Sequence, residues 1–342
     1  MVLTGKGGVG KSTLSAAVAS LAARHGLSVL LVELEGRSGP IGAVGHDALT
    51  HGENTPEENT PSAPGIDDPG SPSAAIRLRT MTPDEALTEY LVAHGFGRAA
   101  RRLARSGMVD VAATGIPGVR DILVLGKIAQ LERAHAADLI VLDGPAAGHA
   151  ATFFTSAPGL LDSTRAGPVH AQAAEVAEFL ADPTRCQIVP VTLAEETPVN
   201  ETVGLVHTLQ SRLGTHVGPV IVNGMYPRLE YLDADPEVAA AAAGVTLQPG
   251  EADAMRAAAV FRRRRQEMQA EQATRLAEAL ALPQLWLPQL FSPEIGLPEI
   301  ARLVDAMETG LAHLRQPSRT PWTGLTKRRA GLRHAASMGS RT

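Results

Sequence analysis

The sequence predicts an α/β fold, namely a doubly wound, mostly parallel sheet flanked by helices, with a helical subdomain. Short and almost continuously apolar runs recur along the 342 residues, as expected for strands of a parallel sheet covered on both faces. Alanine- and leucine-rich stretches separate these runs, and this alternation is typical of the α/β class. With 44% hydrophobic and 20% charged residues, the chain can bury a substantial core.

The predicted elements follow one another in a regular alternation along the chain. One aliphatic run includes Pro190, which cannot donate to a ladder, so we expect that strand to bulge or to lie at a sheet edge. Residues 79–135 are amphipathic and predict the helical subdomain, with its apolar side chains in the core. Strands are expected at residues 1–3, 28–34, 139–143, 187–192, 219–223 and 284–288, and long helices at 12–24 and 197–213.

Three segments depart from this alternation. Residues 39–75 contain six prolines and six acidic residues without Lys or Arg, which predicts a disordered acidic insertion. Residues 316–342 carry basic residues and no acidic ones, which predicts a flexible basic tail after a single domain over residues 1–315. The run Arg262–Arg265 is interpreted as a solvated basic helix face, with a partner-binding or anion-binding surface as the alternative.

Composition excludes several classes of function. The net charge of −5 and the 3% aromatic content give no drive toward nucleic acid and no base-stacking platform. A single cysteine, Cys186, excludes an internal disulfide framework and a zinc site built from several cysteines of one chain. Neither a signal peptide nor an apolar run of about 20 residues is recognisable, so we expect a cytoplasmic protein.

The strongest local signal is a phosphate-binding loop of the form G-x-x-x-x-G-K-[ST], which begins at Gly5. Its glycines allow the backbone amides to converge on phosphate oxygens, and the helix that follows adds the positive end of its dipole. Lys11 should reach the β- and γ-phosphates, and the Ser12 hydroxyl should bind Mg²⁺. The motif therefore predicts a P-loop NTPase that uses ATP and Mg²⁺. The expected nucleotide-binding residues are Gly7, Gly8, Val9, Gly10, Lys11, Ser12 and Thr13.

A second signal is the apolar run 139–143, which ends in Asp143 as a Walker B strand does. Asp143 is therefore the second expected magnesium residue, acting through a bound water. Gly148 follows five residues later, where its N–H can report the presence of the γ-phosphate.

Lys6 extends the loop to K-G-G-x-G-K-[ST], the deviant Walker A form. This form resembles the dimeric ATPase superfamily that includes ArsA-type, MinD and ParA proteins. The resemblance implies that Lys6 crosses a dimer interface toward the phosphates of the partner's nucleotide. A cation delivered in this way would couple phosphoryl-transfer chemistry to association.

Further segments are similar to the ArsA and tail-anchored-protein-targeting branch of that superfamily. The stretch from Gly144 to His149 resembles its D-T-A-P-T-G-H switch without the threonines. Glu35 falls where that branch carries the aspartate that positions the attacking water, and Glu33 is the competing candidate. The likeness also implies that Asn223 reads adenine and that Pro288 flanks it. Lys6, Lys11 and Glu35 are thus the expected catalytic residues.

Two departures from this branch narrow the expected function. No paired cysteines precede the helix that includes residues 259–268, so an intersubunit zinc clamp is not expected. One cysteine cannot supply the several thiolates that arsenite requires.

Three functions follow from these resemblances. The leading one is an ArsA-like Mg²⁺-dependent ATP hydrolase that couples its cycle to dimer closure and to an unidentified client or membrane partner. The second is a regulatory nucleotide-binding subunit with weak or no hydrolysis, paired with a paralogous ATPase, so that homodimer and heterodimer both stay open. The third is a MinD/ParA-type positioning ATPase. A peripheral membrane location would come only through a partner.

Overall fold

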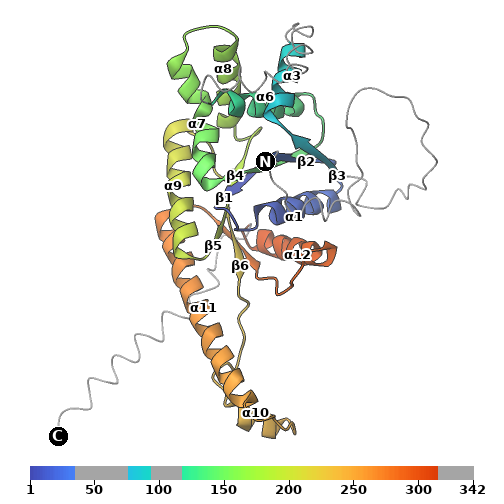
Figure 1. The fold of residues 1–342 in the computed structure, drawn as a ribbon, viewed down its shortest axis with the longest axis vertical. Helices are drawn as coiled ribbons and strands as arrows, with labels where there is room; N and C mark the ends of the chain where they lie inside the picture. The colour runs from blue at the N-terminus through green and yellow to red at the C-terminus, as the bar shows by residue number, and fades with distance from the viewer. Residues whose placement is uncertain (35–75, 94–117, 315–342) are drawn as a thin grey trace, which may run out of the picture.

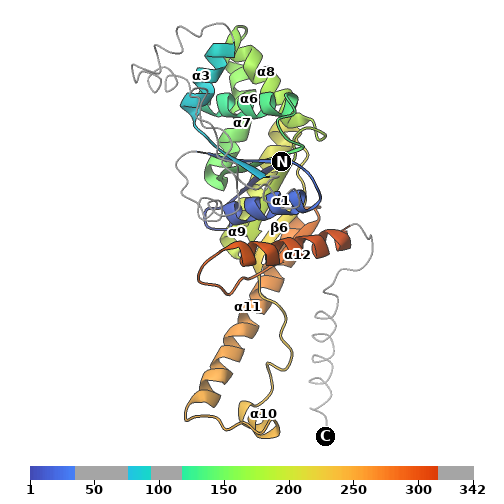
Figure 2. The ribbon, with the colours of Figure 1, turned by 90° about the vertical axis from the view of Figure 1, so that its right-hand side faces the viewer.

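The structure is a computed structural model that describes residues 1–34, 76–93 and 118–314 (Figures 1 and 2). Its centre is one seven-stranded sheet in the order β3-β2-β4-β1-β5-β6-β7, and every neighbouring pair is parallel. This confirms the predicted fold class. The strands are β1 (Val2–Gly5), β2 (Val29–Leu34), β3 (Ile76–Met81), β4 (Leu139–Ala146), β5 (Ile188–Leu193), β6 (Val220–Met225) and β7 (Gln284–Pro288).

Helices cover both faces of the sheet, because consecutive strand residues point to opposite sides. In β2, Leu30 and Val32 belong to one buried cluster, whereas Leu31 belongs to the other. The first cluster includes side chains of α6 (Val119–Arg133), α7 (Ala147–Ser163), α8 (Pro168–Ala181) and α9 (Glu196–Leu213). The second includes those of α1 (Lys11–Arg24) and α12 (Leu297–Leu314). The remaining described helices are α3 (Pro83–Ala93), α10 (Pro236–Ala242) and α11 (Glu251–Ala279).

The predicted strands all form, but β3 was not predicted. Residues 79–81, assigned from sequence to a helical subdomain, belong to this strand, and the helical part of that region begins with α3. The sequence of β3 carries Arg77 and Arg79, which interrupt its apolar pattern, and its place at the edge of the sheet tolerates them. The predicted insertion 39–75 and tail 316–342 lie outside the described residues.

Pro190 lies in a central strand, so of the two expected alternatives the edge position is wrong and an irregularity in the ladder is what occurs. β5 pairs with β1 throughout, including Thr4 with Pro190. Toward β6 the pairing breaks at this point: Ile188 bridges Val217, and the ladder resumes with Val191 opposite Ile221. An advance of three residues along β5, from 188 to 191, thus corresponds to four residues on the paired segment, from 217 to 221. This irregularity falls where the proline has no N–H to offer.

The long helix α11 projects away from the sheet, and α10 lies at its far end (Figures 1 and 2). No helix within the described ranges is both long and apolar enough to cross a membrane.

Candidate functional site

The phosphate loop joins the end of β1 to the start of α1, at the carboxyl edge of the sheet. Gly5 passes so close to β5 that a Cβ there would lie 2.0 Å from the carbonyl oxygen of Val191. Gly10 adopts the left-handed conformation, with φ of 90°, directly before the first helical residue. Only glycine satisfies both the close approach and the backbone angle without strain.

Lys11 is buried at the base of this loop, and its ammonium donates to the carbonyl oxygen of Lys6 at 2.9 Å. The side chain therefore spans the loop and places a cation within it. A buried cation inside a glycine-rich turn at a helix N-terminus is the arrangement that binds phosphate groups. Gly7 and Gly8 line the same loop, and Thr13 lies in the first turn of α1.

The predicted magnesium residues meet one another. Ser12 donates to a carboxylate oxygen of Asp143 at 2.6 Å, and Ser15 donates to the other oxygen at 3.4 Å. Asp143 is 1% exposed. A carboxylate and a hydroxyl fit Mg²⁺, which takes few protein ligands and keeps several waters. A cluster of three or more His, Cys, Asp or Glu residues able to hold a metal does not occur in the described part of the chain.

Glu33 is the second carboxylate at this point. It is in register with Asp143 on the neighbouring strand, so both side chains leave the same face of the sheet. Burial, and then the charge of Asp143, raise the pKa of the Glu33 carboxyl. The structure thus brings Glu33 to the predicted magnesium residues, whereas Glu35 lies outside the described residues.

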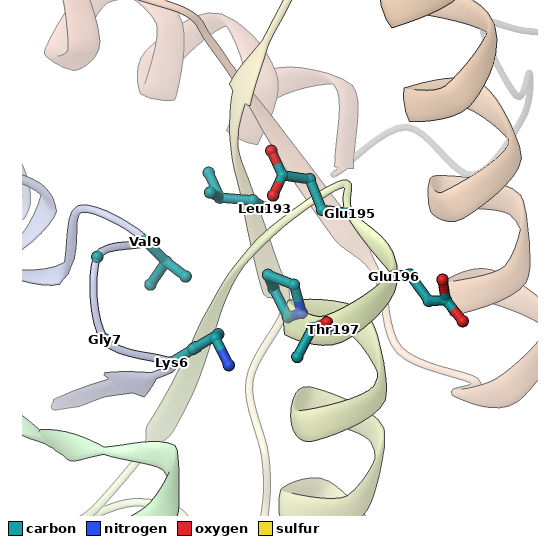
Figure 3. A pocket seen from close by; sticks show the side chains of 9 residues that line it. Lys6, Gly7, Val9, Leu193, Glu195, Glu196 and Thr197 are labelled. Carbon is teal, nitrogen blue, oxygen red and sulfur yellow. The ribbon is translucent and has the colours of Figure 1, made fainter.

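Lys6 forms an ion pair with Glu201 of α9 in the same chain. It lines a cavity of about 400 Å³ between the phosphate loop and the start of α9, where Glu195 and Glu196 contribute to the lining. Figure 3 shows Lys6 directed toward the first turn of α9. Both Lys6 and Glu201 keep about a third of their side chains exposed, so this lysine is at the surface, unlike Lys11. Glu201 lies 195 positions from Lys6, so no local motif predicts this contact.

The two predicted adenine residues lie at the same edge of the sheet. The Asn223 side-chain amide donates to the Val9 carbonyl oxygen at 2.9 Å, so it braces the phosphate loop. Pro288 ends β7 opposite Met225 in the ladder with β6. The structure therefore gives Asn223 a contact that the sequence did not predict, and its role toward adenine stays a prediction.

Gly148 and His149 occupy the first turn of α7, directly after β4, and both are exposed. Asp121 of α6 lies close enough to His149 for the charges of the two side chains to interact. Burial raises the pKa of the Asp121 carboxyl, and His149 opposes that rise. The predicted switch residue thus begins a helix that points its N-terminus toward the carboxyl edge of the sheet.

The family model of the CobQ/CobB/MinD/ParA nucleotide binding domain matches residues 1–325. The chain belongs to this family. The ATPase BagA of Mycobacterium tuberculosis H37Rv is 34% identical over 236 residues, which cover 66% of this chain and 65% of that protein. Relatives from Mycobacterium bovis and from a second Mycobacterium tuberculosis strain match with the same identity and coverage. The match therefore spans 65% of the length of these relatives.

Within this nucleotide-binding fold, the basic run of α11 is mostly engaged. Arg263 pairs with Asp233, and Arg265 pairs with Glu195. Arg262 donates to the Pro227 carbonyl oxygen and stacks over the Tyr226 ring at 4.6 Å. Three of the four guanidinium groups thus contact other residues of the same chain. The run is therefore not a uniformly solvated basic face.

Proposed function

We propose that this chain is a Mg²⁺-dependent ATPase of the ArsA-like type, which couples ATP binding and hydrolysis to closure of a dimer. The observation that carries this proposal is the pair of lysines on one loop. Lys11 is buried within the loop, whereas Lys6 lies at the surface beside a cavity. A buried cation serves the chain's own nucleotide, and a surface cation on the same loop is available to a second subunit.

Each residue then has a distinct task. The loop amides and Lys11 hold the triphosphate, and Ser12 with Asp143 would hold Mg²⁺. The metal, when bound, neutralises charge that develops on the phosphate oxygens. Either Glu33 in β2 or Glu35, two positions later in the sequence, orients the attacking water.

Lys6 has to leave Glu201 before it can contact a phosphate of the partner's nucleotide. The free-energy cost of this step is small, because the Lys6 ammonium is paired with an anion both before and after it moves. Closing of the dimer would draw Lys6 across the interface, and hydrolysis would weaken its contact. We also propose that an unidentified client or membrane partner uses this cycle and that the protein is cytoplasmic.

Two other functions use the same site. The absence of the switch threonines favours a regulatory subunit with weak hydrolysis that pairs with a paralogous ATPase. A MinD/ParA-type positioning ATPase fits the family equally well. The internal pairing of Arg263 and Arg265 favours the ArsA-like alternative over a ParA-like duplex-binding face.

The test measures nucleotide binding and phosphate release separately. Binding of a fluorescent ATP analogue should be lost in Lys11→Ala and retained in Lys6→Ala. Phosphate release should be lost in both variants. Normal phosphate release by Lys6→Ala would refute the role in trans, and an unaltered ATP affinity in Lys11→Ala would refute the site itself.

Two further measurements separate the alternatives. A zero rate for the purified chain that rises on mixing with a paralogous ATPase would favour the regulatory subunit. Salt-sensitive retention on DNA in the presence of ATP would favour the ParA-type function.

A further inference from the structure

Exposed apolar side chains concentrate on the projecting part of the molecule. We define the arm as residues 226–265, which include α10 and the first half of α11. Between residues 227 and 262, Pro236 is the single buried residue. Seven of the twelve large hydrophobic side chains that are exposed in the described residues lie on the arm: Leu229, Tyr231, Val238, Val245, Met255, Val260 and Phe261. A segment with this composition and no core of its own indicates an interaction surface.

Two sides of α11 within the arm are already in use. One side faces the segment that leads outward from β6 to α10, with Arg256 paired to Asp235 and Arg263 paired to Asp233. An adjacent side of the helix faces the body of the protein, where Arg265 forms an ion pair with Glu195. These contacts leave the outer side of the helix to solvent.

The outer side carries a regular pattern, which we call the outer stripe. It consists of Asp253, Ala257, Val260 and Arg264, separated by four, three and four residues, with Phe261 at its rim. Residues at this spacing lie along one line of a helix, and alternating steps of three and four form the seam of a helix pair. All five are exposed, Phe261 by 62%.

The stripe is complementary to itself when it is turned end to end. A two-fold axis between residues 258 and 259 places Asp253 opposite Arg264 at both ends and Ala257 opposite Val260 in the middle. A parallel pair would instead place like charges together. Arg264 is exposed and has no ion pair with another described residue, so it is available for this contact. Asp253 keeps a bond to Arg256, which Asp235 and Glu237 also hold.

We propose that the outer stripe of α11 binds the same stripe of a second copy of this chain as an antiparallel helix pair. Such an interface is isologous, since each copy contributes the same patch. Small side chains at its centre let the two helices approach to about 8 Å. The overlap of residues 253–264 is about 18 Å long. This is a short interface, so the pair forms and dissociates with protein concentration.

This contact does not use nucleotide, and it therefore goes beyond the dimer closure proposed above. Its charges are at the surface, so added salt should weaken it. The two assemblies are separable, because Lys11→Ala removes only the one that depends on ATP.

The first test is a charge exchange, followed by sedimentation velocity of the full chain without nucleotide over a range of concentrations. Wild type and Lys11→Ala should self-associate equally. Asp253→Arg and Arg264→Asp should each raise the dissociation constant by about 10-fold or more, since each reverses two contacts of the symmetric pair. Asp253→Arg combined with Arg264→Asp should return it to within about 3-fold of wild type. Asp253→Asn, which only removes a charge, is the matched control and should have an intermediate effect.

The second test determines the orientation of the helices by disulfide formation. Ala257→Cys mixed with Val260→Cys should give a disulfide between copies faster than either variant alone. Native Cys186 is 1% exposed and should not compete. A wild-type chain that stays monomeric without nucleotide at every concentration would overturn the proposal. A double charge exchange that fails to restore association, or faster disulfide formation by Ala257→Cys alone, would also overturn it.

Discussion

Substitution of Gly10 by alanine tests how the phosphate loop is held. Gly10 has a left-handed backbone, and a Cβ at this position would lie 2.6 Å from the Asn223 side-chain nitrogen. That nitrogen donates to the Val9 carbonyl oxygen, so the new methyl group must displace the bond that braces the loop. Gly26 is the matched control, because its φ is 81° and a Cβ there meets nothing within 4 Å.

The expected costs follow from these two environments. A left-handed backbone costs a residue with a side chain about 1–2 kcal/mol, and this applies to both positions. Loss of the Asn223 bond adds about 0.5–1.5 kcal/mol at position 10 alone. We therefore expect Gly26→Ala to lower the free energy of unfolding by about 1–2 kcal/mol and Gly10→Ala by about 1.5–3.5 kcal/mol.

Urea unfolding at equilibrium measures both values, and a double-mutant cycle isolates the clash. Asn223→Ala should cost less in the Gly10→Ala background than in wild type, because its bond is already displaced there. ATP affinity should fall in Gly10→Ala and stay unchanged in Gly26→Ala. Equal destabilisation by the two alanines, together with an additive cycle, would refute this account of the loop.

Three further predictions concern titratable side chains. The folded-state pKa of Glu33 is raised by burial and Asp143, so its neutral form is favoured on folding and its stabilising contribution is lost as pH rises through that value. Glu33→Gln should therefore have a higher free energy of unfolding than wild type at pH 7, and the two proteins should be equally stable well below the ordinary pKa of 4.5. A difference in stability that does not change with pH would contradict this. Glu201→Gln should release Lys6 from its ion pair. Without nucleotide, the rate of Lys6 acetylation measured by mass spectrometry should therefore be higher in this variant than in wild type, and an equal rate would contradict the ion pair. Burial raises the pKa of the Cys186 thiol to about 11, so maleimide should label it only after unfolding.

Much of the fold could be read from local patterns. The aliphatic runs that became β2, β4, β5 and β6 are buried on both faces, and such runs are apolar almost throughout. β3 was missed because Arg77, Arg79 and Thr80 interrupt its apolar pattern, which a strand at the edge of the sheet tolerates. Arg79 pairs with Glu89 of α3, and Arg77 donates to the Ala136 carbonyl oxygen. The second of these contacts joins positions 59 residues apart, which no short window of sequence connects.

The phosphate loop, the predicted Ser12 and Asp143 pair and the class of fold all follow from local sequence patterns. Those features depend on glycines, a lysine and a hydroxyl within nine consecutive residues, and on an aspartate that ends an apolar run. The groups that hold Lys6 and the loop, in contrast, are set by contacts between distant parts of the chain. Glu201 and Asn223 reach the loop from positions 195 and 214 residues away. Contacts at such separations depend on the order of strands in the sheet, which periodicity and spacing do not encode.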